Sequence, residues 1–482
     1  MTSPHLRIVL PEGENSPLFL ALSRTLAQDI RRGRLLPGQK LPGSRTLAGQ
    51  LGIHRNTVLA AFAELEQEGW IETVPKRGTF VARNFPESVP ARPARIRPVP
   101  VALDLPEVLP PEPYQPPPRG VLPLVGGLPD LRLVPRVELA RAYRRALTRA
   151  PSALSYGSEW GNPRLRRALG RYLADTRAVV AGADGPLVTR GSQMAIYLCA
   201  RAILRPGTAV AVEALGYRPA WEALKLAGAR LIPVPVDELG LNVGALAELC
   251  RRERIGLVYV TPHHQYPTTV TLPAPRRLEL LALARDRRFA ILEDDYDHEH
   301  HYDGRPVLPL ASVDSDVVLY VGTLSKVLAP GLRIGYVTGP PPVVERAARL
   351  RLYVDRQGDH VVEEAVAELI EDGALERHLR RARRHYRERR DALVGALRER
   401  FGDTLSLRAP TGAMALWARV LGRVSVDAWA ARALTLGVLV QPGRRFRFDG
   451  EASPHLRLGF GALTPEEIGR AVDRLARAKP AR

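Results

Sequence analysis

GTLSKVLAPGLRIGY, at residues 322–336, is the most informative stretch of this sequence. It places a lysine, Lys326, beside two hydroxyl residues, Thr323 and Ser325, and seven residues before an arginine, Arg333. An amine can form a Schiff base with an aldehyde, and hydroxyl and guanidinium groups can hold a phosphate. The chain has only five lysines among many arginines, so a lysine here indicates a nucleophile rather than a simple positive charge. The stretch therefore predicts a site for a phosphorylated aldehyde.

Residues 120–482 have the pattern of an α/β fold. Apolar runs that end in polar residues alternate with longer helical patterns. Such runs are typical of buried parallel strands. We therefore expect a domain with a mostly parallel central sheet. Its clearest strands are expected at residues 207–213, 256–262, 289–294 and 316–322.

Residues 1–82 predict a winged helix-turn-helix. Apolar residues four apart, from Leu18 to Ile30, form one helical stripe. A second and a third helix follow and are joined at Gly52, and we expect Ser44 to cap the second helix. In a helix-turn-helix, the second helix of such a pair enters the major groove of DNA. The later elements are expected at residues 45–51 and 54–68 for the helices and 71–74 and 78–81 for the wing.

The segment between these regions, residues 83–119, is expected to be an extended linker, because residues 86–118 include twelve prolines. The chain has no apolar run of about 18 residues and no signal-peptide pattern, so we expect neither a membrane span nor secretion. Cys199 and Cys250 are expected to be core thiols of a cytoplasmic protein. The net charge is +19, but residues 1–82 contribute only +3, so bulk charge does not locate a DNA site.

Further segments of the large domain supply groups that suit a pyridine cofactor. Asp294 ends a predicted strand, at the sheet edge where ligands bind, and a carboxylate there keeps a pyridinium nitrogen protonated. Tyr296 follows on the same segment and is expected to face the ring hydroxyl. Amide groups at the start of a helix can receive a phosphate. The other expected groups are Gly191, Ser192 and Gln193 at the phosphate, Tyr217 on the ring face with Arg218 beside it, and His264 and Gln265 near the ring substituents.

Taken in order, these motifs resemble those of the MocR/GabR-type regulators, which fuse a GntR-type winged helix to a fold-type I aminotransferase-like domain. The N-terminal motifs are Leu-Pro-x-Ser-Arg-x-Leu-Ala at 41–48 and Arg-Asn-Thr-Val at 55–58. The C-terminal motifs are Thr-Pro-x-His-Gln-Tyr-Pro at 261–267, Glu-Asp-Asp-Tyr-Asp at 293–297 and Gly-Thr-Leu-Ser-Lys at 322–326. The resemblance covers nearly the whole chain apart from the linker.

The resemblance implies pyridoxal 5'-phosphate (PLP) bound through an aldimine at Lys326, with Asp294 at the ring nitrogen and Tyr296 at the ring oxygen. It also implies a homodimer that binds operator DNA and senses an amino acid, an amine or PLP itself. The remaining implied residues are Ser192, Gln193, Thr323, Ser325, Arg333 and a partner-subunit Tyr156 at the phosphate, Tyr217 on the ring, Arg457 and Arg218 at an effector carboxylate, and Arg45, Arg55, Asn56, Thr57, Arg77 and Gly78 at DNA.

A second function stays open from the sequence, namely a functional PLP-dependent aminotransferase with an accessory DNA-binding domain. All the groups needed for half of a transamination are present, whereas a winged helix and a linker serve no such reaction. Two positions depart from the family pattern. His54 opens the recognition helix where serine is common, and Thr268-Thr269 follows the Pro267 loop where glycine is usual.

Two clusters are expected to be structural. His298, His300 and His301 suggest a metal site, but we expect none, because His300 and His301 would lie on opposite faces of an extended strand. The arginine-rich run at 377–390 keeps an apolar stripe, so we expect a solvated amphipathic helix rather than a second DNA contact.

Overall fold

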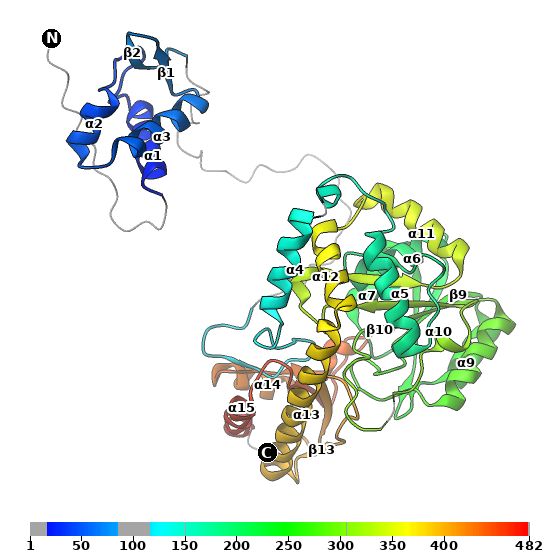
Figure 1. Cartoon of the computed structure of the whole chain (residues 1–482). Coiled ribbons are helices and arrows are strands. Elements are labelled where there is room, and N and C mark those ends of the chain that lie inside the picture. Colours follow the sequence, from blue (N-terminus) through cyan, green and yellow to red (C-terminus); the bar gives the residue numbers. More distant parts are fainter. Residues whose placement is uncertain (1–16, 85–115, 150, 305, 481–482) are drawn as a thin grey trace, which may run out of the picture. The chain divides into compact units, whose positions relative to one another are not determined.

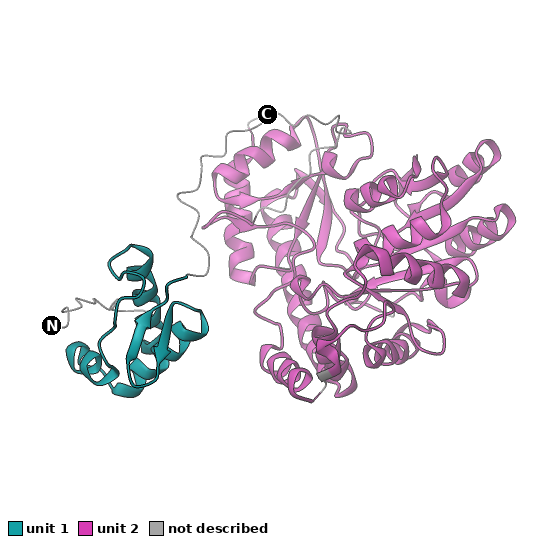
Figure 2. Cartoon of the chain, turned by 90° about the horizontal axis from the view of Figure 1, so that it is seen from above, with its two compact units in different colours: residues 1–112 teal, residues 113–482 magenta. Residues whose placement is uncertain are grey.

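A computed structural model describes residues 17–84, 116–149, 151–304 and 306–480. The chain divides into two compact units, residues 1–112 and 113–482, which are coloured separately in Figure 2. Most of the expected linker, residues 83–119, lies outside the described residues.

The first unit contains three helices and a two-stranded antiparallel ribbon. Apolar side chains from all five elements form one core, which includes Leu22, Leu47, Val58 and Val81. The ribbon follows the third helix, as a wing does. The elements are α1 (Leu18–Arg31), α2 (Ser44–Leu51), α3 (Arg55–Gln67), β1 (Ile71–Val74) and β2 (Gly78–Val81).

The turn between α2 and α3 confirms one expectation and corrects another. Gly52 ends α2 in the left-handed conformation at φ 65°, which glycine adopts without a steric penalty. Ser44 is not the cap of α2, as the sequence suggested. It is the first helical residue, and Gly43 occupies the cap position, where no side chain accepts a hydrogen bond from the helix. His54 caps α3, because its Nδ1 accepts a hydrogen bond from the Asn56 amide at 3.2 Å.

The second unit is built on a seven-stranded sheet in the order β4-β12-β11-β10-β9-β5-β6. All pairs from β11 to β6 are parallel, and only β12 runs antiparallel to its neighbours β11 and β4. The four expected strands are present with small shifts at their ends. The bounds are β4 (Leu187–Thr189), β5 (Ala209–Glu213), β6 (Arg230–Val234), β9 (Ile255–Val260), β10 (Ala290–Asp295), β11 (Val318–Thr323) and β12 (Gly335–Thr338).

Both faces of this sheet are buried, which explains its continuous apolar strands. Val258 and Ile291 belong to the core on one face, whereas Leu257 and Leu292 belong to the core on the other. Helices cover both faces, and α4 lies beside α12 (Figure 1). The bounds are α4 (Arg136–Arg149), α5 (Pro163–Arg177), α6 (Ser192–Ile203), α7 (Arg218–Leu226), α8 (Val243–Arg252), α9 (Ala274–Arg287), α10 (Leu310–Val313), α11 (Pro341–Val354) and α12 (His360–Glu371).

A smaller C-terminal layer contains a four-stranded sheet in the order β13-β14-β17-β16 with its own apolar core. The long helix α13 contacts both α12 and this layer (Figure 1). Short strand pairs β15-β3 and β7-β8 complete the unit. The bounds are α13 (Ala374–Phe401), α14 (Val426–Thr435), α15 (Pro465–Ala478), β3 (Leu122–Pro123), β7 (Val236–Asp237), β8 (Gly240–Leu241), β13 (Leu405–Leu407), β14 (Ala415–Val420), β15 (Val438–Leu439), β16 (Gln441–Pro442) and β17 (His455–Gly459).

Helix α13 confirms the expected amphipathic helix, but its arginines are not all solvated. Arg389 and Arg390 are buried, Arg389 pairs with Asp130 at 2.6 Å, and Arg390 pairs with Asp303. Both cysteines are buried and free of disulfide bonds, which confirms them as core thiols. Among the described residues, no helix is long and apolar enough to cross a membrane.

Candidate functional site

Lys326 lies just after the carboxyl end of β11, at the edge of the sheet where ligands bind in such folds. Its Nζ donates a hydrogen bond to the Gly127 carbonyl oxygen at 2.5 Å. Burial, with a smaller contribution from the positive charge of Arg457, lowers the pKa of the amine to about 8, although the carboxylates of Asp297 and Asp294 oppose this shift. A larger share of the amine is therefore unprotonated near neutral pH, as a nucleophile requires.

Asp294 on β10 presents an unpaired carboxylate oxygen in the interior. Its Oδ2 accepts a hydrogen bond from the Tyr259 hydroxyl at 2.8 Å, whereas Oδ1 has no hydrogen-bond partner among the described residues. The side chain is buried, and burial raises the pKa of the carboxyl to about 7. A buried acceptor without a partner is costly. A protonated pyridine nitrogen would supply the missing donor, so Asp294 fits the ring of PLP.

The start of α6 and Arg333 lie together and form the expected anion-binding corner. Gly191 is the cap residue of α6 at φ 83°, and the helix begins with Ser192 and Gln193. A Cβ atom added at Gly191 would lie 2.6 Å from Arg333 Nη2, so only glycine permits this approach. The guanidinium donates to the Arg190 carbonyl oxygen at 2.9 Å. Free amides at a helix start next to a guanidinium suit a phosphate group.

Two hydroxyls lie close together on the segment that carries Lys326. Thr323 Oγ1 and Ser325 Oγ are 3.0 Å apart, and both residues are buried. Thr323 Oγ1 also accepts a hydrogen bond from the Ser325 amide at 3.1 Å and donates to the Ile334 carbonyl oxygen at 3.1 Å. Hydrogen bonds within the protein therefore fix the positions of these two hydroxyls, which are expected to bind the phosphate.

Aromatic and polar side chains surround the expected ring position. Tyr217 occupies the cap position of α7 and packs edge-on against Tyr266, with ring centroids 5.3 Å apart. The Tyr296 hydroxyl donates to the His264 carbonyl oxygen at 2.9 Å. The ring of His264 pairs with the Asp297 carboxylate at 2.7 Å. Its contact with the cofactor therefore stays a prediction, because its Nδ1 is already used within the protein.

Arg457 on β17 is a buried cation that has no carboxylate partner within the described part of the chain. It is 2% exposed, and its Nε and Nη1 have no hydrogen-bond acceptor. The guanidinium lies over the Tyr266 ring at 4.4 Å, and a Cβ added at Gly126 would lie 1.6 Å from Nη1. This arrangement fits an anionic ligand. Arg218, the other expected effector residue, lies exposed at the first position of α7.

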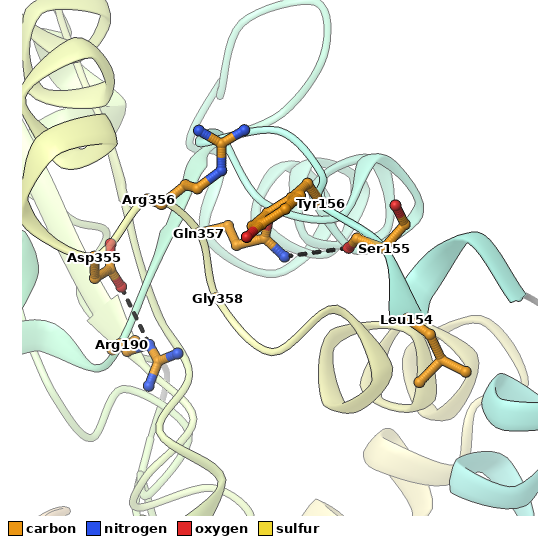
Figure 3. Close-up of a pocket in the computed structure, with 8 residues that line it drawn as sticks. All are labelled: Leu154, Ser155, Tyr156, Arg190, Asp355, Arg356, Gln357 and Gly358. Carbon is orange, nitrogen blue, oxygen red and sulfur yellow. Dashed lines mark hydrogen bonds and ion pairs between the residues drawn. The ribbon is translucent and has the colours of Figure 1, made fainter.

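Tyr156 lies outside this buried group. Its side chain is 80% exposed, and the Arg356 guanidinium lies 4.7 Å from its ring centroid. It lines an open hollow of about 490 Å³ together with Arg190 and Gln357 (Figure 3). Arg190 directly precedes Gly191, so the hollow adjoins the anion-binding corner.

The loop after Tyr266 contains a residue other than glycine in the left-handed conformation. Thr269 adopts φ 64°, a conformation that costs a β-branched residue about 1–3 kcal/mol. Its amide donates to the Gln265 carbonyl oxygen at 2.7 Å, and the Thr268 hydroxyl donates to Gln265 Oε1 at 2.6 Å. These bonds hold the loop in a turn that glycine would adopt without strain.

The expected DNA-binding residues lie on the surface of the first unit. Arg45 on α2 is exposed, as are Arg55 and Asn56 in the first turn of α3, while Thr57 beside them is partly buried. Arg55 Nε donates to Ser44 Oγ at 3.3 Å. The helix-turn-helix therefore presents these side chains together.

At the tip of the wing, Arg77 is exposed and Gly78 adopts φ 115°. A Cβ at Gly78 would lie 2.8 Å from Cε of Lys40, so this turn favours glycine.

Several residues of this site were missed in the sequence. Tyr259 holds Asp294, Gly127 receives Lys326, Tyr266 lies under Arg457, and Asp297 holds His264. Tyr259 is a polar residue within an apolar strand, and Gly127 belongs to a glycine pair after an apolar run. Both signals were present but are too common to select these residues without the fold.

Comparison with known proteins agrees with the two units of this fold. The family model "Aminotransferase class I and II" matches residues 126–475, and "Bacterial regulatory proteins, gntR family" matches residues 20–81. The chain is 30% identical to the probable rhizopine catabolism regulatory protein MocR of Rhizobium meliloti, over 98% of this chain and 95% of that protein. It is 31% identical to the HTH-type transcriptional regulator TauR of Rhodobacter capsulatus, over 99% of this chain and 100% of that protein.

Among solved structures, the chain resembles LysN, alpha-aminoadipate aminotransferase from Thermus thermophilus, complexed with N-(5'-phosphopyridoxyl)-L-leucine. The TM-score is 0.69 at 31% identity, covering 75% of this chain and 92% of that one. The chain therefore belongs to the MocR-type family of PLP-dependent transcriptional regulators, which join a GntR-type domain to an aminotransferase class I and II domain. The predicted fold class and cofactor are thereby confirmed.

Proposed function

We propose that this regulator senses an amino acid or a related amine at the PLP site of its second unit and alters its binding to operator DNA in response. The main support is that one site contains both Lys326 and Arg457. One offers an amine of lowered pKa, and the other offers a buried guanidinium without an acceptor for two of its nitrogens. A ligand that carries both an amino group and a carboxylate would use both features.

The residues around Lys326 would each hold one part of the cofactor. PLP supplies an electrophilic aldehyde and an electron-accepting ring when it is bound. Lys326 would attach the aldehyde, Asp294 would keep the ring nitrogen protonated, and Tyr296 would lie at the ring oxygen. Tyr217 would stack on the ring. The phosphate would be held by Gly191, Ser192, Gln193, Thr323, Ser325 and Arg333.

The exposed position of Tyr156 supports a homodimer. This tyrosine is 80% exposed in the single chain. In a two-fold dimer, each subunit would cover the tyrosine of the other, and each tyrosine would reach the phosphate site of the other subunit. A two-fold dimer also presents two winged helices to two operator half-sites. The DNA contacts would come from Arg45, Arg55, Asn56, Thr57, Arg77 and Gly78, and the protein would act in the cytoplasm.

A ligand switches such a protein only if it binds two arrangements of the dimer with different affinity. Engagement of Arg457 by a carboxylate is the physical change that would distinguish the two. The alternative trigger is PLP itself, whose ring nitrogen would donate a hydrogen bond to the unpaired oxygen of Asp294. These two triggers differ in one respect: only the first depends on Arg457.

The test is a titration of the PLP-loaded full chain with a panel of amino acids, amines and keto acids, followed through its visible spectrum and its operator affinity. We expect one ligand class to shift both. Arg457→Gln should keep the cofactor band but lose the response to amino acids, whereas Arg419→Gln, an exposed arginine on β14, should respond normally. An unchanged response of Arg457→Gln would refute the assignment. Full conversion to the pyridoxamine form, reversed by a keto acid, would favour the aminotransferase function.

A further inference from the structure

Four histidines come together beside the cofactor site, at the carboxyl ends of two neighbouring parallel strands. His263 and His264 follow β9, whereas His298 and His301 follow β10. The His263 ring packs against His264 and against His298, each at a centroid distance of 4.4 Å, and His301 lies 6.1 Å from His263. The pairing of the two strands therefore assembles a cluster that neither segment shows alone.

This cluster corrects the sequence argument about the histidines. Residues 298–299 form a turn, His301 pairs with Gly412 in an isolated β-bridge, and the side chains of His300 and His301 contact different groups. His300 Nε2 lies 3.0 Å from the Lys326 carbonyl oxygen and its ring packs edge-on against Tyr386, while His301 belongs to the cluster. The second group of ligands, which the sequence did not reveal, is His263 and His264.

The ring nitrogens of this cluster are mostly unused. Both nitrogens of His263, both of His301 and Nε2 of His264 are buried and have no hydrogen-bond partner in the part of the chain that the structure describes. His263 and His264 are 3% and 1% exposed. Buried polar atoms in folded proteins nearly always have partners. A neutral imidazole has one lone-pair nitrogen, so the three rings can offer one lone pair each to an ion. One nitrogen from each of the three residues lies within 4.8 Å of the others.

We propose that His263, His264 and His301 bind a divalent transition-metal ion of the Zn²⁺ class. Imidazole nitrogens suit zinc, copper and nickel better than calcium or magnesium. Zinc–nitrogen bonds of about 2.0–2.1 Å in a tetrahedral site place ligand atoms about 3.3 Å apart. The candidate nitrogens lie within 4.8 Å of one another, so they would have to move closer together when an ion binds. The fourth position is open to water or to another ligand.

His264 contacts a carboxylate through its far ring nitrogen, as metal-binding histidines commonly do. Its Nδ1 pairs with the Asp297 carboxylate at 2.7 Å, which leaves Nε2 turned toward the cluster. A carboxylate on the far nitrogen fixes the tautomer and strengthens the near nitrogen as a ligand. Gly412 keeps space beside it, since a Cβ there would lie 2.2 Å from His264 Nε2.

Two further observations agree with an ion at this place. His301 is the least buried of the three residues, so it marks the side of the cluster nearer to solvent. Asp295 and His298 form a second possible group with His263, so the cluster offers a carboxylate on its other side.

The experiment uses the full chain without a histidine tag, loaded with PLP and stripped of metal by a chelator. Zn²⁺ is added, excess ion is removed by gel filtration, and bound zinc is counted by mass spectrometry and by calorimetric titration. We expect one ion per chain. His263→Gln and His301→Ala should each weaken binding at least as much as the loss of a second-shell carboxylate, which is about 10–100-fold.

His385→Ala is the matched control, because His385 lies on α13 with an exposed side chain and outside the cluster. It should bind zinc as the parent chain does. Binding below one ion per chain, or unchanged binding in His301→Ala, would overturn the proposal. If both cluster variants fail to fold by circular dichroism, X-ray absorption of the zinc-loaded parent decides: an imidazole shell supports the site, and an all-oxygen shell overturns it.

Discussion

The first unit exposes the side chains expected to act, whereas the second buries them. Arg45, Arg55 and Arg77 lie in solvent around an apolar core that does not involve them. Asp294 and Arg457 are 3% and 2% exposed, and each keeps unpaired polar atoms. A surface that contacts DNA costs the free unit little, while a buried polar site is costly until its ligand arrives. The difference predicts that ligands should stabilise the second unit far more than the first.

The largest expected effect comes from Lys326→Ala. Without the amine no covalent link to the PLP aldehyde can form, so the absorbance band of the lysine-linked cofactor should disappear. Operator binding by the first unit should persist, because Lys326 lies in the other unit. The matched control is Lys225→Ala, at an exposed lysine on α7 paired with Glu222. A retained band in Lys326→Ala would break the assignment of the nucleophile.

Asp294→Asn should change how the stability of the cofactor-free protein depends on pH. Burial raises the pKa of Asp294 to about 7 from 3.8, so folding favours the protonated carboxyl. The ionised carboxylate lowers the free energy of unfolding. This loss is absent below about pH 4, grows as pH rises and reaches its full value above about pH 7, with an upper bound of about 4 kcal/mol. The uncharged amide avoids this penalty and can still accept from Tyr259.

Thermal unfolding at several pH values checks this prediction. Cofactor-free Asp294→Asn should be more stable than the parent chain at about pH 8, and the two should converge toward about pH 4. The same variant should bind PLP more weakly. Asp316→Asn, at a side chain that is 80% exposed, should follow the parent at every pH. A uniform shift at all pH values would show that packing, rather than ionisation, causes the effect.

Arg55→Ala tests the exposed side of the comparison. If Arg55 contacts the edge of a guanine, its loss should weaken specific operator binding by about 1–3 kcal/mol and relax the preference at one base pair. The thermal stability should change little, because Arg55 is exposed. Arg24→Ala, an exposed arginine on α1, serves as the control. An equal loss on random DNA would assign Arg55 to the phosphate backbone instead.

The smallest effect is expected at the wing. Arg77 lies at an exposed turn tip, and a phosphate contact there is independent of sequence. Arg77→Ala should weaken binding to all DNA sequences alike and reduce the salt slope of binding by about 1. Fluorescence anisotropy at several salt concentrations measures both quantities. A change in sequence preference with an unaltered slope would contradict a phosphate contact.

The sequence predicted features carried by short motifs and missed those made by packing between them. The wing at β1 and β2, the Gly52 turn and the position of Lys326 after β11 each depend on residues close in sequence. The unpaired oxygen of Asp294 depends on Tyr259 from the neighbouring strand β9. The Ser44 cap was wrong by one residue, because serine is equally acceptable in the first helical turn.

The histidines show the same limit more strongly. From the sequence alone, His300 and His301 were expected on opposite faces of a strand, and no second group of histidines was evident. The ligands that complete the cluster, His263 and His264, come from a segment more than thirty residues earlier. Only the parallel pairing of β9 and β10 brings the two segments together. Likewise, Arg389 and Arg390 looked solvated until their partners Asp130 and Asp303 were placed.

The central claim is that a ligand at the Lys326 site controls operator binding, and one measurement tests it most directly. Operator DNA is selected from a random pool with the PLP-loaded full chain, and its affinity is measured with and without the amino acid that shifts the visible spectrum. The account predicts that the affinity or the preferred half-site spacing changes in the parent chain and stays constant in Lys326→Ala. Identical operator binding with and without that ligand in the parent chain would contradict the account.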